Sequence, residues 1–187
     1  MSGIFSPLTG AVLSVPTDVI LALDVGNSRI KFGLLVPPQA VDQHQLPTVL
    51  ATIAQPVAEV VDWTALSQLC ADSSVQVKLA TIAGANPNLV ARLQANWPGG
   101  EWPVPRVIQR GTALPLSTSV EFPDQVGIDR LLAAVAVNAL RPPDRAALFI
   151  SAGTATTVNL VTDSGVFAGG AIWPGLGLGA RSLQKFT

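Results

Sequence analysis

Apolar and polar positions divide this chain into short strands and helices, and the order of elements begins twice. Residues 18–25 are almost continuously apolar, which is typical of a central strand covered on both faces. Residues 29–36 form the second arm of a hairpin, and two stretches of the same kind recur at residues 147–151 and 155–162. The pattern therefore predicts an α/β fold with a mixed sheet, β-hairpins and flanking helices, started two times.

Other stretches complete the predicted order of elements. The further expected strands are residues 47–54, 75–82, 104–109 and 166–172, and the expected helices are 64–71, 87–97, 129–140 and one from 176 or 178 to 186. The helix at 129–140 has an apolar stripe made of Leu131, Leu132, Val135, Ala136 and Ala139. We expect a tail at residues 1–17, a first domain at 18–125 and a second, incomplete domain at 126–187.

One loop pattern accounts for the repetition. Residues 21–35 read LALDVGNSRIKFGLL and residues 148–162 read LFISAGTATTVNLVT. An alignment without a gap places Asp24 on Ser151, Gly26 on Gly153, Asn27 on Thr154 and Lys31 on Val158. A glycine beside small polar residues at a hairpin tip lets backbone N–H groups approach an anion. Two such tips suit a nucleoside triphosphate, so phosphoryl transfer is the leading hypothesis.

Composition narrows the classes of function. Apolar residues make up 49% of the chain and charged residues 12%, and the net charge is −1. This balance argues against a nucleic-acid partner. The longest apolar run falls short of a membrane span, and the N-terminus lacks the basic start of a signal peptide. The single cysteine, Cys70, is compatible with a reducing cytosol, so a cytoplasmic protein without a membrane partner is expected.

The segment DVGNSRIK, residues 24–31, offers groups for nucleotide phosphates. Asp24 ends a strand, where a carboxylate can hold Mg²⁺. Asn27 and Ser28 can donate to phosphate oxygens, and Lys31 can return along the hairpin as a positive charge. The alternative is an ordinary hairpin in which Asp24 and Asn27 bond only the local backbone.

The segment VGIDR, residues 126–130, opens the predicted helix at 129–140. An ionised Asp129 can accept the proton of a substrate hydroxyl during phosphoryl transfer, and Arg130 can hold a substrate carboxylate. The alternative, which the local sequence favours, makes Asp129 a helix cap and Arg130 a surface charge.

Two later segments complete the candidates. SAGTATT, residues 151–157, presents threonine hydroxyls beside Gly153, or is simply a threonine-rich edge strand. In GVFAGGAIWPGLGLG, residues 165–179, Gly169 and Gly170 permit a flat group such as adenine to lie against backbone, or form a flexible bend.

Taken in order, the four segments resemble type III pantothenate kinase, of the acetate and sugar kinase, Hsp70 and actin superfamily. The resemblance implies a duplicated actin-like (ribonuclease H-like) fold with an incomplete second copy. It implies the transfer of phosphate from ATP, with Mg²⁺, to the primary hydroxyl of pantothenate, the first step toward coenzyme A. It also implies a homodimer with the substrate site near the dimer interface.

The resemblance assigns roles residue by residue. It implies Asp129 as the catalytic base. It implies ATP binding by Asp24, Val25, Gly26, Asn27, Ser28, Arg29, Ile30, Lys31, Thr154, Gly169 and Gly170. It implies pantothenate binding by Gly127, Ile128, Asp129, Arg130, Thr187 and a residue near Val120 or Phe122.

The chain departs from the family pattern in three places. Ser151 stands where the family has an aspartate that binds potassium or ammonium, and a neutral hydroxyl binds such a cation weakly. Val120 stands near a position that is often aromatic, and the family continues beyond the position of Thr187. Three hypotheses follow: an active pantothenate kinase, a catalytically impaired relative with a nucleotide-binding or regulatory role, and another small-molecule kinase of the superfamily.

Overall fold

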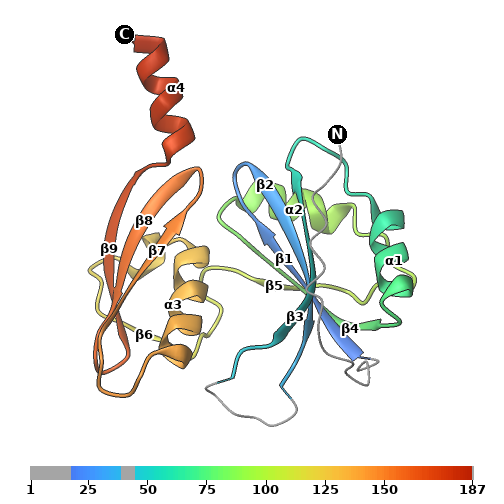
Figure 1. Cartoon of the computed structure of the whole chain (residues 1–187), viewed down its shortest axis with the longest axis horizontal. Helices are drawn as coiled ribbons and strands as arrows, with labels where there is room; N and C mark the ends of the chain where they lie inside the picture. The colour runs from blue at the N-terminus through green and yellow to red at the C-terminus, as the bar shows by residue number, and fades with distance from the viewer. Residues whose placement is uncertain (1–17, 39–44, 187) are drawn as a thin grey trace. The chain divides into compact units, whose positions relative to one another are not determined.

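The computed structural model describes residues 18–38 and 45–186. The predicted tail at residues 1–17 and the predicted substrate residue Thr187 therefore lie outside the described residues. The chain divides into two compact units, one up to Gln109 and one from Arg110 onward. Each unit is built on one mixed sheet, blue to yellow-green in the first and yellow to red in the second (Figure 1).

The first unit contains a five-stranded sheet in the order β3-β2-β1-β4-β5. Its strands are β1 (Asp18–Val25), β2 (Arg29–Val36), β3 (Thr48–Pro56), β4 (Gln76–Gly84) and β5 (Arg106–Ile108). β1, β2 and β3 form an antiparallel meander, whereas β4 pairs with β1 and β5 pairs with β4 in parallel. The central position of β1 explains its apolar sequence.

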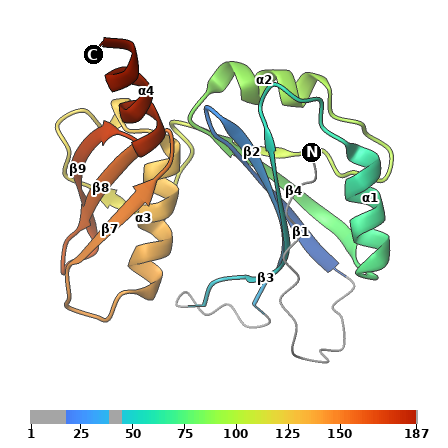
Figure 2. The ribbon, with the colours of Figure 1, turned by 45° about the horizontal axis from the view of Figure 1, so that its top comes forward.

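Two helices cover one face of this sheet, as Figure 2 shows. Helix α1 (Trp63–Asp72) begins at Asp62, whose carboxylate accepts a hydrogen bond from the Ala65 N–H. Helix α2 (Pro87–Ala95) begins at Asn86, whose Oδ1 accepts a hydrogen bond from the Leu89 N–H and so caps the predicted helix.

Burial along β1 alternates instead of being complete on both faces. Leu21, Leu23 and Val25 are buried under the helices, whereas Ala22 is half-buried and Asp24 is exposed. The expectation that β1 is covered on both faces is therefore wrong for the described residues. The reason is that α1 and α2 both pack on the same face.

The second unit contains a four-stranded sheet in the order β6-β9-β8-β7. Its elements are β6 (Ser117–Thr118), a 3-10 turn (Pro123–Gln125), α3 (Ile128–Leu140), β7 (Ala147–Ala152), β8 (Ala155–Val161), β9 (Val166–Pro174) and α4 (Leu176–Phe186). β7, β8 and β9 form an antiparallel meander, and β6 pairs with β9 in parallel. The predicted last helix is confirmed, while β6 and the 3-10 turn lie between residues 109 and 129, where no element was predicted.

Helix α3 packs through a different side from the predicted one. Ile128 and Ala134 are its buried residues, and Leu131 and Val137 pack against the same core. The predicted stripe shares only Leu131 with this side. Almost every residue of α3 is apolar, so the pattern cannot select a face.

The repeat predicted from the sequence is present in the structure as the meanders β1–β2–β3 and β7–β8–β9. Their first hairpins differ in length, because Val25 pairs with Ile30 whereas Ala152 pairs with Thr156. The structural counterpart of Lys31 is therefore Thr157. The alignment without a gap placed Lys31 on Val158, one residue further along the chain. The predicted duplicated α/β fold is confirmed, with one residue fewer in the second hairpin.

Candidate functional site

The first hairpin presents a short polar tip on a fixed backbone. The Gly26 N–H donates to the Arg29 carbonyl at 3.0 Å, and a Cβ on Gly26 would lie 3.0 Å from the same oxygen. The Ser28 carbonyl accepts from the Val57 N–H at 3.2 Å, which ties the tip to the end of β3. Asn27, Ser28 and Arg29 are exposed. The tip is thus held by its backbone while its side chains face solvent.

Asp24 and Lys31 are direct neighbours across this hairpin. The Lys31 Nζ lies 2.9 Å from Asp24 Oδ2, and the two side chains are 63% and 51% exposed. An exposed pair of this kind contributes little to stability because water and salt screen it. The pair can therefore separate at small cost in free energy, so that the Lys31 ammonium binds an external anion and the Asp24 carboxylate binds an external cation.

Two residues behind the hairpin were not predicted as part of it. Gly84 ends β4 beside Val25, and a Cβ on Gly84 would lie 2.5 Å from the Val25 carbonyl oxygen. The Nδ2 of Asn86 lies 3.4 Å from Asn27 Oδ1, a long hydrogen bond, while the Oδ1 of Asn86 caps α2. The sequence feature that could have indicated both residues is Gly84, which stands two positions before the Asn86-Pro87 start of the helix. The N-terminus of α2 is thereby placed beside the hairpin tip.

The start of α3 differs from the simplest interpretation of its sequence. Gly127 is the residue that precedes the helix, and no side chain caps it. Asp129 is exposed in the first turn, and its carboxylate lies where a Cβ of Gly127 would be. The alternative that made Asp129 the helix cap is therefore wrong. The helix N-terminus stabilises an exposed carboxylate at this position.

Arg130 is held by buried groups. Its Nε donates to Asn159 Oδ1 at 2.7 Å, and the Asn159 Nδ2 donates to Thr157 Oγ1 at 3.0 Å. The guanidinium carbon lies 5.7 Å from the centre of the Phe167 ring, within the range of a cation–π contact. Asn159 and Phe167 are fully buried. The alternative that made Arg130 a free surface charge is therefore wrong, because contacts with β8 and β9 fix its orientation.

Sequence reasoning missed Asn159 and Phe167. Asn159 lies two residues beyond Thr157 in a strand of apolar neighbours, where a buried amide requires partners. That single polar position was the available signal, but its partner on α3 could not be read from spacing.

The second hairpin is packed against the start of α4. The Gly153 N–H donates to the Ala155 carbonyl at 2.9 Å, and the Gly175 N–H donates to the Thr154 carbonyl at 2.9 Å. A Cβ on Gly175 would overlap the carbonyl groups of Gly153 and Thr154, so only glycine fits. Thr154 and Ser151 are exposed, and Ser151 pairs with Thr157 across the hairpin.

Gly169 and Gly170 lie at an irregular point of β9. Their φ angles are +86° and +159°, and the pairing with β8 shifts register between Asn159 and Val161. A Cβ on Gly169 would lie 3.1 Å from Val120 Cγ1, and a Cβ on Gly170 would overlap the backbone of β8. The strand geometry thus requires both glycines. A contact with ATP remains a prediction.

The two residues proposed near the substrate differ in environment. Val120 is half-buried against the core of the second unit, whereas Phe122 is 57% exposed. Within the second unit the structure joins Arg130 to β8 and Val120 to Gly169. Residues 24–31 belong to the first unit.

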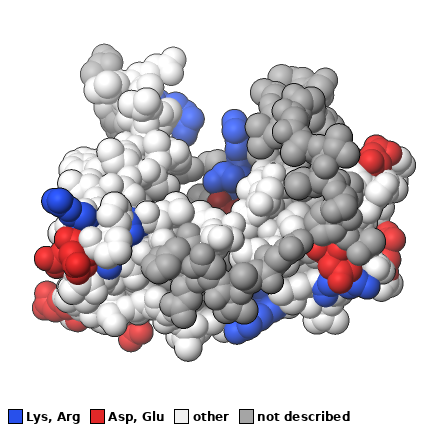
Figure 3. Space-filling view, turned by 60° about the horizontal axis from the view of Figure 1, so that its bottom comes forward, with Lys and Arg blue, Asp and Glu red and all other residues white. Residues whose placement is uncertain are grey.

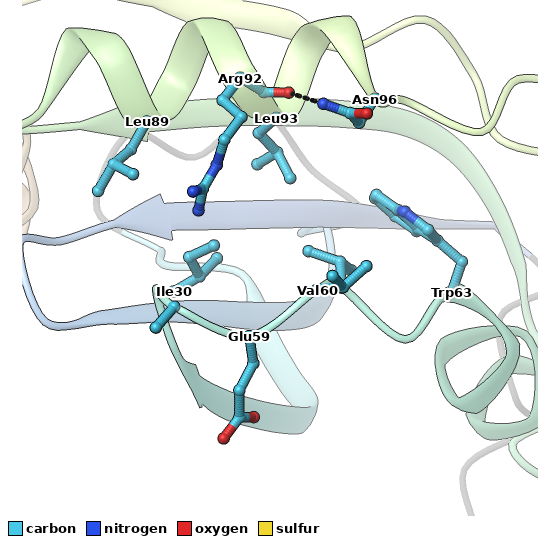
Figure 4. Close-up of a pocket in the computed structure, with 10 residues that line it drawn as sticks. Ile30, Glu59, Val60, Trp63, Leu89, Arg92, Leu93 and Asn96 are labelled. Atoms are coloured by element: carbon cyan, nitrogen blue, oxygen red, sulfur yellow. Dashed lines mark hydrogen bonds between the residues drawn. The ribbon is translucent and has the colours of Figure 1, made fainter.

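The first unit also contains a cavity of about 350 Å³ between α2 and the turn after β3. Its walls are mostly apolar, and Figure 4 shows Arg92 reaching into it while Glu59 points away. The Arg92 Nη2 donates to the Val57 carbonyl at 2.6 Å. Of the predicted site residues, only Ile30 lines this cavity. The cavity therefore shares one residue with the predicted site.

Charge and membrane features are limited. On the face in Figure 3, charged side chains lie in small groups separated by uncharged surface. None of the helices in the described part of the chain combines the length and apolar character needed to cross a bilayer. Residues 18–38 and 45–186 contain no group of three or more His, Cys, Asp or Glu side chains that could hold a metal ion.

The sequence model of one protein family, described as type III pantothenate kinase, matches residues 20–187. The chain belongs to the type III pantothenate kinase family. The resemblance stated from the four segments is thus confirmed. Two curated type III pantothenate kinases show how similar the sequences are. The protein of Nitratidesulfovibrio vulgaris is 31% identical over 183 residues, covering 91% of this chain and 64% of the relative. That of Dechloromonas aromatica is 36% identical over 172 residues, covering 90% and 65%.

This chain spans less than two thirds of the length of those type III pantothenate kinases. Among solved structures, an Aquifex aeolicus member of the Ppx/GppA protein family is 11% identical with a TM-score of 0.46, covering 91% of this chain and 55% of that one. A glucokinase from an Antarctic psychrotroph is 15% identical with a TM-score of 0.41, covering 87% and 51%.

Proposed function

We propose that this chain binds ATP and pantothenate and phosphorylates the primary hydroxyl of pantothenate, as a cytoplasmic, homodimeric enzyme of coenzyme A synthesis. The observation that carries the proposal is the start of α3. An exposed carboxylate, Asp129, stands beside an arginine whose orientation is fixed by Asn159 and Phe167. An acid and a pre-oriented guanidinium on adjacent residues suit a substrate that has a hydroxyl and a carboxylate.

Asp129 takes the role of base in this proposal. Its carboxylate accepts the hydroxyl proton as the substrate oxygen bonds to the γ-phosphorus and the bond to the β-γ bridging oxygen breaks, releasing ADP. Arg130 pairs with the substrate carboxylate through its terminal nitrogens, since its Nε is engaged by Asn159. Gly127 and Ile128 supply backbone at the same helix start, and Val120, Phe122 and Thr187 complete the proposed substrate contacts.

Residues 24–31 take the role of phosphate segment, with Thr154, Gly169 and Gly170 as further ATP contacts. Lys31 would leave Asp24 for a phosphate, and Asp24 would hold Mg²⁺. The half-exposed carboxylate oxygen fits this hard cation, which in kinases neutralises charge on the phosphates. The site of a monovalent cation does not fit in the same way. Ser151 offers only a neutral, exposed hydroxyl, so we propose turnover that does not depend on potassium or ammonium.

A coupled ATPase assay with and without pantothenate tests this function. Asp129→Asn should lower pantothenate-dependent turnover by about a hundredfold or more, because the amide cannot accept the proton. Asp124→Asn is the matched control, an exposed aspartate in the preceding 3-10 turn, and should leave turnover unchanged. Equal turnover of Asp129→Asn and the parent chain would contradict the assignment.

The neutral Ser151 favours a second candidate, a catalytically impaired relative that binds nucleotide and acts as a regulatory protein. ATP binding measured by calorimetry, without turnover in the presence of pantothenate, would support this candidate. Turnover with a different small alcohol would support another kinase of the superfamily.

A further inference from the structure

The cavity between α2 and the turn after β3 brings an arginine into mostly apolar surroundings. Its large apolar wall residues include Ile30, Val60, Trp63, Leu89 and Leu93. Its volume of about 350 Å³ lies above the roughly 300 Å³ at which pockets for small molecules begin. The cavity is therefore large enough to hold a small organic molecule.

One side of α2 supplies a wall of this cavity. Leu89 is followed by Arg92 and Leu93 three and four positions later, so the three side chains lie on the same side of the helix. Charged residues of an amphipathic helix ordinarily lie on the side away from apolar packing. Arg92 is an exception, and Figure 4 shows its side chain extending from the helix toward Ile30.

The guanidinium of Arg92 has no acidic partner in the part of the chain that the structure describes. Its Nη2 donates to the Val57 carbonyl at 2.6 Å, and the ion pairs of residues 18–38 and 45–186 do not include it. Glu59 also lines the cavity, but its carboxylate points away (Figure 4). A guanidinium has five N–H donors, so the single carbonyl leaves most of them available. The ligand that such a cation attracts is an anion.

The turn opposite α2 is held in place by hydrogen bonds of its own. The Val57 N–H donates to the Ser28 carbonyl at 3.2 Å, which attaches the start of the turn to the first hairpin. The Gln55 Nε2 donates to the carbonyl oxygens of Glu59 and Val60, both at 3.4 Å. The walls are therefore formed before a ligand binds, which is the usual condition of a small-molecule site.

The environment of the wall residues indicates the chemical class of the ligand. Ile30 and Leu93 are buried, whereas Val60 lines the cavity and is 92% exposed, so the cavity opens to solvent beside Val60. An apolar chain can cover these residues while a charged head meets Arg92. Arg92 is the one cation among the described residues that line the cavity, which suits a ligand with a single negative charge. Its planar guanidinium matches the two oxygens of a carboxylate.

We propose that this cavity binds a small monocarboxylate with an apolar chain, of the class of a medium-chain fatty acid. The carboxylate pairs with Arg92, and the chain lies along Leu89, Leu93 and Val60. Charge complementarity carries the proposal, since the cation has an apolar wall around it and no acidic partner among the described residues. Of the residues proposed to contact ATP or pantothenate, only Ile30 lines the cavity. The inference therefore goes beyond the proposed function, and its test does not require turnover.

Isothermal titration calorimetry of the full chain with octanoate tests the proposal. Octanoate should bind saturably at one site with a dissociation constant of about 1 mM or lower, an affinity in keeping with a ligand of this size. Octanamide has the same chain and an uncharged head, so it should bind about tenfold more weakly, because it lacks the charge-assisted hydrogen bonds. Octylamine, which has a positive charge, should not bind.

Three variants locate the binding site. Val60→Asp should weaken octanoate binding by about tenfold or more, because the new carboxylate in the cavity wall competes with the ligand for Arg92. Val104→Asp is the matched control. It adds the same charge at another exposed valine of the first unit, 88% exposed and outside the cavity, and should bind octanoate like the parent chain. Arg92→Gln should make octanoate and octanamide bind equally.

Nuclear magnetic resonance gives an independent measurement. Octanoate should shift the amide signals of residues 57–61 and 89–96, and circular dichroism should show the Val60→Asp variant folded, since this side chain is exposed in the parent chain. The proposal is overturned if octanoate does not saturate the chain by about 10 mM, if octanoate and octanamide bind the parent chain equally, or if Val60→Asp binds octanoate like the parent. Amide shifts confined to β7, β8 and β9 would place the ligand in the second unit and also overturn it.

Discussion

Replacing Asn159 by leucine tests the group of contacts that orients Arg130. Asn159 is fully buried on β8, and its side chain joins Arg130 Nε to Thr157 Oγ1. Leucine has the same number of side-chain heavy atoms with the same branching, so Asn159→Leu removes two hydrogen bonds without leaving a cavity. The half-buried guanidinium then loses the acceptor that it meets at 2.7 Å.

The size of the effect follows from those two bonds. A hydrogen bond to a charged group contributes about 1.5–3 kcal/mol to stability and a neutral one about 1 kcal/mol. Because water can partly replace the acceptor at the half-buried Arg130, we expect the free energy of unfolding to fall by about 2–3 kcal/mol. Without this acceptor the Arg130 side chain can change rotamer and must be ordered again when substrate binds. This cost should raise the KM for pantothenate about tenfold. The kcat should change less, because Asp129 makes no contact with Asn159.

Urea denaturation and steady-state kinetics measure the two quantities. Asn159→Asp is the matched control, since a carboxylate keeps the acceptor for Arg130 and can accept from the Thr157 hydroxyl. Its KM should stay within about threefold of the parent value. Unchanged stability and KM in Asn159→Leu would refute the reasoning. An equal rise in KM for the leucine and aspartate variants would show that the acceptor for Arg130 is not the property that matters.

Four further outcomes are expected. Gly84→Ala should destabilise the fold by about 1–3 kcal/mol in urea denaturation, because its Cβ would overlap the neighbouring strand. Gly33→Ala, where a Cβ meets only ordinary contacts, should cost less than about 1 kcal/mol. Asp24→Asn should change the free energy of unfolding by less than about 1 kcal/mol, since its ion pair is exposed, yet calorimetry should show weaker binding of ATP with Mg²⁺. Replacing potassium by sodium should leave turnover unchanged, whereas Ser151→Asp should create a preference for potassium; a strong requirement in the parent chain would contradict this. Burial raises the pKa of the Cys70 thiol, so iodoacetamide at pH 8 should alkylate it more slowly than it alkylates free glutathione.

The sequence was most informative where a signal was local. Hairpins around Gly26 and Gly153, the cap at Asn86 and the helix after Gly175 follow from residue types within a few positions. The order of elements along the chain also followed, because the hairpin pattern repeats in both halves.

Predictions failed where packing between distant elements decides the outcome. The buried side of α3 depends on which residues β8 and β9 present to it, and an almost wholly apolar helix has no pattern to read. The Arg130–Asn159 contact joins positions 29 residues apart on two elements, so spacing could not reveal it. The shorter turn of the second hairpin could not be predicted either, because an alignment of two short sequences does not show which residues pair across each hairpin.

The two meanders have their helices on opposite sides. In β1 the odd-numbered side chains, such as Leu21 and Leu23, enter the interior of the first unit. In β7 the interior residue is Phe149, which the alignment of the two hairpins places on Ala22, a residue on the opposite face of β1. Successive side chains of a strand point to opposite faces, so the parity of the apolar positions determines where helices can attach. A duplicated meander can thus acquire a different set of neighbours when alternate residues change, while the order of its strands and the glycine of its first turn are kept.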